Sequence, residues 1–129
     1  LALLQQAQFL EASRSVRRAL RLNPRAPTGL LMSLAQVNFA AGRRAEAVEQ
    51  LEHLRKANSD HIASRVVLAA HYEREGRHDQ ASAAVDEILR VNTDFSVERA
   101  EAMFPNAELV FGSQEFAEIV VALRAAGLP

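Results

Sequence analysis

SLAQVNFAAGRRAEAVEQLEHLRKAN, residues 33–58, and VLAAHYEREGRHDQASAAVDEILRVN, residues 67–92, are two copies of one pattern. Their Gly-Arg pairs set the period, since Gly76 minus Gly42 is 34 residues. A repeat of this length indicates one supersecondary unit used twice. The other matching pairs at this offset are Leu34 with Leu68, Ala35 with Ala69, Ala47 with Ala81, Leu51 with Val85, Leu54 with Ile88, and Asn58 with Asn92.

Each copy is predicted to be a pair of helices joined at its glycine. Apolar residues follow helical spacing before Gly42, and the same spacing restarts after it. Ala47 and Ala81 fall where the two helices of a pair would cross, because alanine allows helix axes to approach closely. A single hairpin cannot bury its apolar face alone, so the copies are expected to stack.

This 34-residue helix-turn-helix period resembles the tetratricopeptide repeat. The resemblance implies an all-α fold, a right-handed stack of helical hairpins (an α-solenoid) with an atypical C-terminal helical cap. The residues that match the family pattern are Leu34, Ala35, Gly42, Ala47, Leu51 and Asn58 in one repeat, and Leu68, Ala69, Tyr72, Gly76, Ala81, Val85 and Asn92 in the next. A further half-repeat fits at an offset of 35 through Phe9, Ala12, Val16, Ala19, Leu20 and Asn23-Pro24.

The sequence departs from the family pattern at three places. The third small position holds Leu54 and Ile88, and the closing proline is replaced by Ser59 and Thr93. The large residue that opens the first helix is Leu31 in one copy and Arg65 in the next. These departures predict looser packing between repeats than in a consensus array.

Four segments are expected along the chain. Residues 1–24 form the second helix of a truncated repeat, residues 25–58 and 59–92 are full repeats, and residues 93–129 are capping helices. The start inside a repeat and without methionine indicates a fragment of a longer protein, and the arginine excess suggests a bacterial source.

The last 37 residues lose the period but keep helical spacing. One apolar stripe, Val97, Ala100 and Phe104, is ended by Pro105, and a second consists of Phe116, Ile119, Val120 and Leu123. Ser113 is the predicted N-cap of the second helix, and Gly127 follows its end. Asp94 to Arg99 and Leu123 to Pro129 are similar to the tail of tetratricopeptide arrays in bacterial regulators, including those fused to class III nucleotide cyclase or winged-helix domains.

Composition excludes several classes of function. With 15 Lys+Arg against 16 Asp+Glu the net charge is -1, which argues against a nucleic-acid or anionic-membrane surface. The absence of cysteine excludes disulfides and thiolate chemistry. The opening Leu1 to Leu4 is far shorter than the roughly 20 apolar residues of a membrane span, so a cytoplasmic protein is expected.

No constellation in the sequence predicts catalysis, a cofactor or a metal site. The histidines are His53, His61, His71 and His78, and none of their separations is the i, i+4 spacing of helical zinc ligands. With five glycines there is no glycine-rich phosphate loop. This fragment is therefore not expected to be an enzyme, although a full-length protein could carry a separate catalytic domain.

In the resembled family, the first helices of the repeats line a concave groove. The residues at the groove positions are Met32, Gln36 and Phe39 in one repeat and Val66, Ala70 and Glu73 in the next. This apolar set suits a partner protein or peptide, such as an amphipathic helix, or another copy of the chain. It lacks the Lys-Asn-Arg clamp that binds chaperone tails. Whether the groove is open or filled by a helix of the chain itself is left open.

Charge is unevenly distributed along the chain. Residues 1–60 hold nine basic and five acidic groups, +4, whereas residues 93–129 hold two basic and six acidic groups, -4. Arg14, Arg17, Arg18 and Arg21 share one helix face, which is either an anionic docking strip or a solvated helix back. Binding a partner protein is the expected function, and the alternative is a homo-oligomerisation or regulatory segment of a signalling enzyme such as a nucleotide cyclase. An RNA-binding repeat would need paired polar readers at one place per repeat, which Met32/Val66 and Gln36/Ala70 do not supply.

Overall fold

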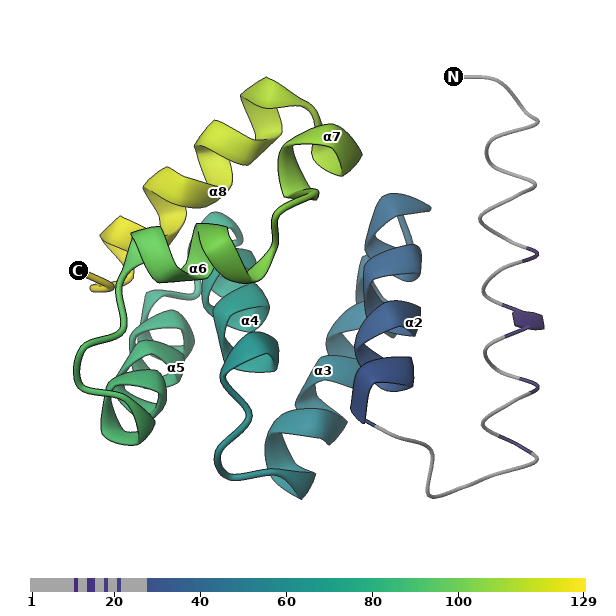
Figure 1. Cartoon of the computed structure of the whole chain (residues 1–129), viewed down its shortest axis with the longest axis horizontal. Coiled ribbons are helices and arrows are strands. Elements are labelled where there is room, and N and C mark those ends of the chain that lie inside the picture. Colours follow the sequence, from purple (N-terminus) through teal and green to yellow (C-terminus); the bar gives the residue numbers. More distant parts are fainter. Residues whose placement is uncertain (1–10, 12–13, 16–17, 19–20, 22–27) are drawn as a thin grey trace. The chain divides into compact units, whose positions relative to one another are not determined.

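The chain folds into helices joined by short turns (Figure 1). The computed structural model describes residues 11, 14–15, 18, 21 and 28–129, and within them there is no strand. The expected all-α class of helical hairpins is therefore confirmed. The helices are α2 (Thr28–Ala40), α3 (Arg44–Ala57), α4 (Ile62–Arg74), α5 (His78–Val91), α6 (Val97–Met103), α7 (Ala107–Phe111) and α8 (Ser113–Ala125).

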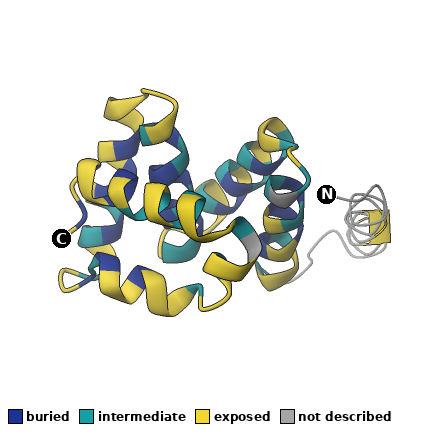
Figure 2. Ribbon diagram, turned by 90° about the horizontal axis from the view of Figure 1, so that it is seen from above, coloured by how far each residue is buried: buried dark blue, intermediate teal, exposed yellow. Residues whose placement is uncertain are grey.

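Two compact units divide the chain, residues 1–57 and residues 58–129. The first contains the hairpin of α2 and α3, and the second contains the hairpin of α4 and α5 followed by α6, α7 and α8. In Figure 2 the outer sides of these helices carry most of the exposed residues. The repeat boundaries at 24, 58 and 92 stay predictions.

The two hairpins turn in the same way. At the end of α2 the Gly42 N–H donates to Phe39 O (3.0 Å) and the Arg43 N–H donates to Asn38 O (2.7 Å). Thirty-four residues later, the Gly76 and Arg77 amides donate to the matching carbonyls of α4 (3.1 and 2.8 Å). This arrangement needs a left-handed residue, and the two glycines supply it with φ of 81° and 78°. The repeated Gly-Arg pair is thus a helix-ending device.

The core of the first unit lies between α2 and α3. Its fully buried apolar residues lie on both helices, and those of α3 are spaced four and three apart, as the sequence predicts: Leu34 and Ala35 on α2, and Ala47, Leu51 and Leu54 on α3. Asn38 is also completely buried, and its Nδ2 donates to Gln50 Oε1 (2.9 Å). A polar bridge between the helices therefore occupies the place that Tyr72 fills in the next repeat.

Helix α4 is the centre of the second unit. It packs against α5, α8 and, less extensively, α6. The seam between α4 and α5 repeats that of the first hairpin and buries Leu68, Ala69, Ala81, Val85 and Ile88.

Beyond α5, the structure corrects two expectations. Ser113 is not the N-cap of α8: Gly112 occupies that position, and Ser113 is the first helical residue, with its hydroxyl donating to Glu108 Oε1 (3.1 Å). The sequence predicted two helices in this region, but the structure has three, because the short helix α7 lies between Pro105 and α8. The predicted ends of the two C-terminal helices are confirmed. Helix α6 stops before Pro105, and Gly127 follows α8 with a φ of 109°.

The predicted half-repeat falls largely outside the described residues. Phe9, Ala12, Val16, Ala19, Leu20, Asn23 and Pro24, which carry that prediction, are among those not described, as is Arg17. The described positions in this stretch are helical and exposed, and they are Glu11, Arg14, Ser15, Arg18 and Arg21.

Overpacking the helix crossings should destabilise both hairpins. Ala47 and Ala81 have no exposed surface, so three added carbon atoms must displace their neighbours. We expect Ala47→Leu or Ala81→Leu to lower the free energy of unfolding by about 1–3 kcal/mol in urea titrations. Ala45→Leu and Ala83→Leu, at exposed positions on the same helices, are the matched controls. Equal effects of the buried and exposed substitutions would contradict the close crossing.

Candidate functional site

Half of the predicted groove lies on α2. Met32, Gln36 and Phe39 are spaced four and three residues apart, which places them on one side of the helix. Met32 is buried, Phe39 is half-buried and Gln36 is exposed. A partner would therefore meet the Gln36 amide and the accessible part of the Phe39 side chain on this helix.

The other half lies on α4, where less surface is available. Val66 and Ala70 are 4% and 5% exposed, and Glu73 is half-buried. Ala70 lies one turn before Arg74, whose guanidinium pairs with Glu115 and Glu118 of α8 (both 3.3 Å). The chain's own C-terminal helices therefore pack on α4, although whether the six residues form a groove stays a prediction.

A buried polar cluster at the start of α4 is the feature that the sequence did not predict as a site. Arg65 is 4% exposed, and its Nη1 donates to the carbonyls of Asn58 (3.0 Å) and His61 (2.9 Å). Its Nε lies 3.4 Å from Glu87 Oε1 on α5. The sequence feature that could have revealed this cluster is Arg65, which stands where the first repeat has Leu31. The cluster ties the loop before α4 to both helices of the hairpin, so it is structural.

His61 caps this helix. Its Nδ1 accepts the Ser64 N–H (3.2 Å) and lies 2.8 Å from the Ser64 hydroxyl oxygen. Nδ1 must be unprotonated to accept the N–H. The pKa of His61 lies below its usual 6.5. Burial of the ring is the larger cause, and the positive charge of Arg65 is the smaller one.

The His61 cap should make stability depend on pH. Because the folded-state pKa is lowered, the unfolded chain binds the proton more readily. The contribution of the cap is present above pH 6.5 and is lost as the pH falls through the folded-state value. We expect the wild-type melting temperature to fall more between about pH 8 and about pH 5.5 than that of His61→Asn, which caps without titrating. Parallel pH profiles for the two proteins would rule out this role.

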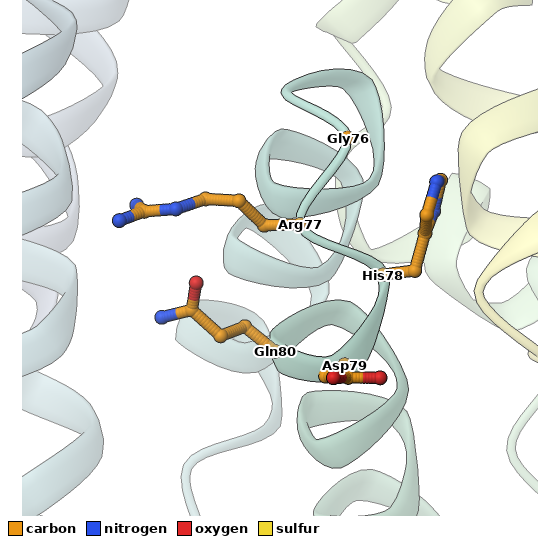
Figure 3. A pocket seen from close by; sticks show the side chains of 5 residues that line it. All are labelled: Gly76, Arg77, His78, Asp79 and Gln80. Carbon is orange, nitrogen blue, oxygen red and sulfur yellow. The ribbon is translucent and has the colours of Figure 1, made fainter.

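A shallow hollow of about 370 Å³ lies at the turn between α4 and α5. Arg77 and Gln80 point to one side of the turn, whereas His78 points to the other (Figure 3). The Arg77 guanidinium lies 5.5 Å from the centre of the Tyr72 ring, and His78 pairs with Glu73. These side chains diverge, so the hollow does not gather polar groups around one point. The remaining residues that line it are Gly76 and Asp79.

The described residues hold no set of three His, Asp or Glu side chains placed to bind a metal ion. In the same part of the chain, every helix is too short or too polar to span a membrane. The chemistry of the described surface is thus that of single ion pairs, exposed amides and partly exposed apolar side chains.

Comparison with known proteins agrees with the repeated hairpins. No curated protein matches the chain. The family model for the tetratricopeptide repeat matches residues 38–104, more than half of the chain, and spans the second helix of one hairpin and all of the next. With the 34-residue period and the two identical glycine turns, this match shows that the chain belongs to the tetratricopeptide repeat family.

Proposed function

We propose that this chain is a protein-binding module that holds an apolar segment of a partner against α2. Tetratricopeptide repeats generally act as non-catalytic scaffolds for protein-protein interaction. The observation that carries the proposal is the difference between the two first helices. Gln36 of α2 is exposed whereas its counterpart Ala70 of α4 is buried, and α2 has the half-buried Phe39 where α4 has the half-buried Glu73.

The chemistry of this face favours an amphipathic helix as the ligand. Phe39 offers aromatic edge and face to an apolar side chain, and aromatic residues often dominate binding energy at interfaces. Gln36 can donate to and accept from the backbone or a polar side chain of the ligand. Met32, which is buried on the same side of α2, can adjust to ligands of different shape because its side chain is unbranched.

Peptide display tests this proposal. Helical peptides selected against the wild-type chain should bind Phe39→Ala at least about tenfold more weakly, because tenfold corresponds to about 1.4 kcal/mol of lost contact. Glu49→Ala, at an exposed position on α3, is the control and should leave affinity unchanged. Circular dichroism of each variant verifies folding. Selected peptides that bind Phe39→Ala and Gln36→Ala as tightly as the wild type would place the binding face elsewhere.

The regulatory alternative keeps the same module in a different setting. As part of a bacterial signalling enzyme such as a nucleotide cyclase, the repeats would bind a segment of that enzyme or of a regulator. Sequencing the gene around this segment tests that setting, because it shows whether a catalytic domain shares the chain.

A further inference from the structure

The C-terminal helices expose two large apolar side chains. Leu109 of α7 is 87% exposed and Val121 of α8 is 64% exposed, more than any other large apolar residue in the described part of the chain. The two helices pack against each other and are joined at Gly112 (Figure 1). Single exposed apolar residues are common, so a contact surface is indicated here by the position of both on one pair of packed helices and by the charges beside them.

Acidic residues accompany both side chains. Glu108 directly precedes Leu109, and Glu118 lies one turn before Val121 on the same side of α8. Both glutamates are exposed, although Glu108 also accepts from the Ser113 hydroxyl and Glu118 also contacts Arg74. We call Glu108, Leu109, Glu118 and Val121 the C-terminal patch. A segment that binds this patch should carry positive charge to pair with the glutamates and aliphatic carbon to cover the apolar side chains.

The opposite end of the sequence supplies that chemistry. Residues 1–60 carry a net charge of +4, and residues 93–129 carry -4. Arg14, Arg18 and Arg21 are helical and exposed, and the sequence predicts from their spacing of four and three residues that they share one helix face. Arginine joins a charged guanidinium to an aliphatic stem that can cover apolar surface.

We propose that the C-terminal patch binds the arginine face of a second copy of this chain, formed by Arg14, Arg18 and Arg21. The arginine stems cover Leu109 and Val121, and the guanidinium groups pair with Glu108 and Glu118. This contact uses a different face from the one proposed for partner peptides on α2, and it stands independently of that function.

The contact joins two different surfaces, so two copies joined by one contact keep one free patch on one copy and one free arginine face on the other. A third copy can add there, or the two free surfaces can meet and close a dimer or ring. In either case the average mass should rise with concentration. Exposed charges are screened by salt, with a Debye length of about 10 Å at 0.1 M ionic strength, so association should weaken as salt is added.

Sedimentation velocity of the whole chain at low and high salt tests the proposal, together with two charge-reversal variants. The first carries Arg14→Glu, Arg18→Glu and Arg21→Glu, and the second carries Glu108→Arg and Glu118→Arg. Each variant alone presents like charges at both surfaces, so its association constant should fall at least about tenfold. An equimolar mixture of the two variants should recover association, because each surface then meets one of opposite charge.

Two controls separate this contact from unrelated effects. Asp79→Arg with Asp86→Arg makes the same charge change at exposed positions of α5 and should leave association intact. Arg74→Ala removes the contact of Glu118 within the chain and should also leave association intact. A wild-type chain that is monomeric at low salt, association that survives either reversal, or a mixture that does not associate would overturn the proposal.

Discussion

Replacement of Arg65 by alanine is expected to lower the free energy of unfolding of the second unit by about 3–5 kcal/mol, as for other buried ion pairs that lose one partner. The guanidinium is nearly inaccessible and bonds two backbone carbonyls of the loop before α4. Without it, the Glu87 carboxyl group loses its partner in a largely buried place, and the carbonyls of Asn58 and His61 each lose a donor. Urea titration followed by circular dichroism measures the loss.

A double substitution distinguishes the ion pair from simple loss of volume. Arg65→Leu with Glu87→Leu removes both charges and replaces them with apolar side chains, with leucine at the position that Leu31 holds in the first repeat. We expect the double variant to recover most of the stability that Arg65→Leu loses, because a buried ion pair replaced by packed apolar residues is often neutral or better. If the double variant is no more stable than Arg65→Leu, the uncompensated charge of Glu87 is not the cause.

Truncation of Leu54 or Ile88 to alanine should cost about 2–5 kcal/mol each. These residues occupy one repeat position, 34 residues apart, and neither has exposed surface. The family pattern has a small residue there, yet each side chain fills its own hairpin, so its removal leaves a cavity. Urea titration of each variant should show a loss of similar size in both repeats.

Lys56→Ala and Arg90→Ala are the controls for this pair, since both positions are exposed on the same two helices. They should change the free energy of unfolding by no more than about 0.5 kcal/mol. A large loss for one buried residue and none for the other would mean that the two copies pack differently.

The hairpins could be predicted from sequence because their determinants are local. A glycine must adopt positive φ to end each helix, and both copies place Gly42 or Gly76 there. Alanine and leucine at helical spacing then fix which side of each helix is buried. The 34-residue period supports this prediction, because the second copy shows the same glycine and the same apolar spacing as the first.

Features that depend on contacts between distant segments could not be predicted. Nothing near Arg65 in the sequence indicates that Glu87 is its partner, and the family pattern indicated only a large residue at this position. The groove positions on α4 were carried over from the family resemblance, which does not show that α8 packs on that helix and that Val66 and Ala70 are buried. Ser113 is helical because Gly112, with a φ of 85°, already provides the break before α8.

Backbone NMR of the whole chain tests the central claim most directly, namely that two copies of one sequence pattern fold into two equivalent hairpins. Secondary chemical shifts should report helices over residues 28–40 and 44–57, and again over 62–74 and 78–91, with breaks at Gly42 and Gly76. The amides of Arg43 and Arg77, bonded to Asn38 and Tyr72, should both exchange slowly with solvent. A helix that continues through either glycine, or strand-like shifts in either copy, would contradict the account.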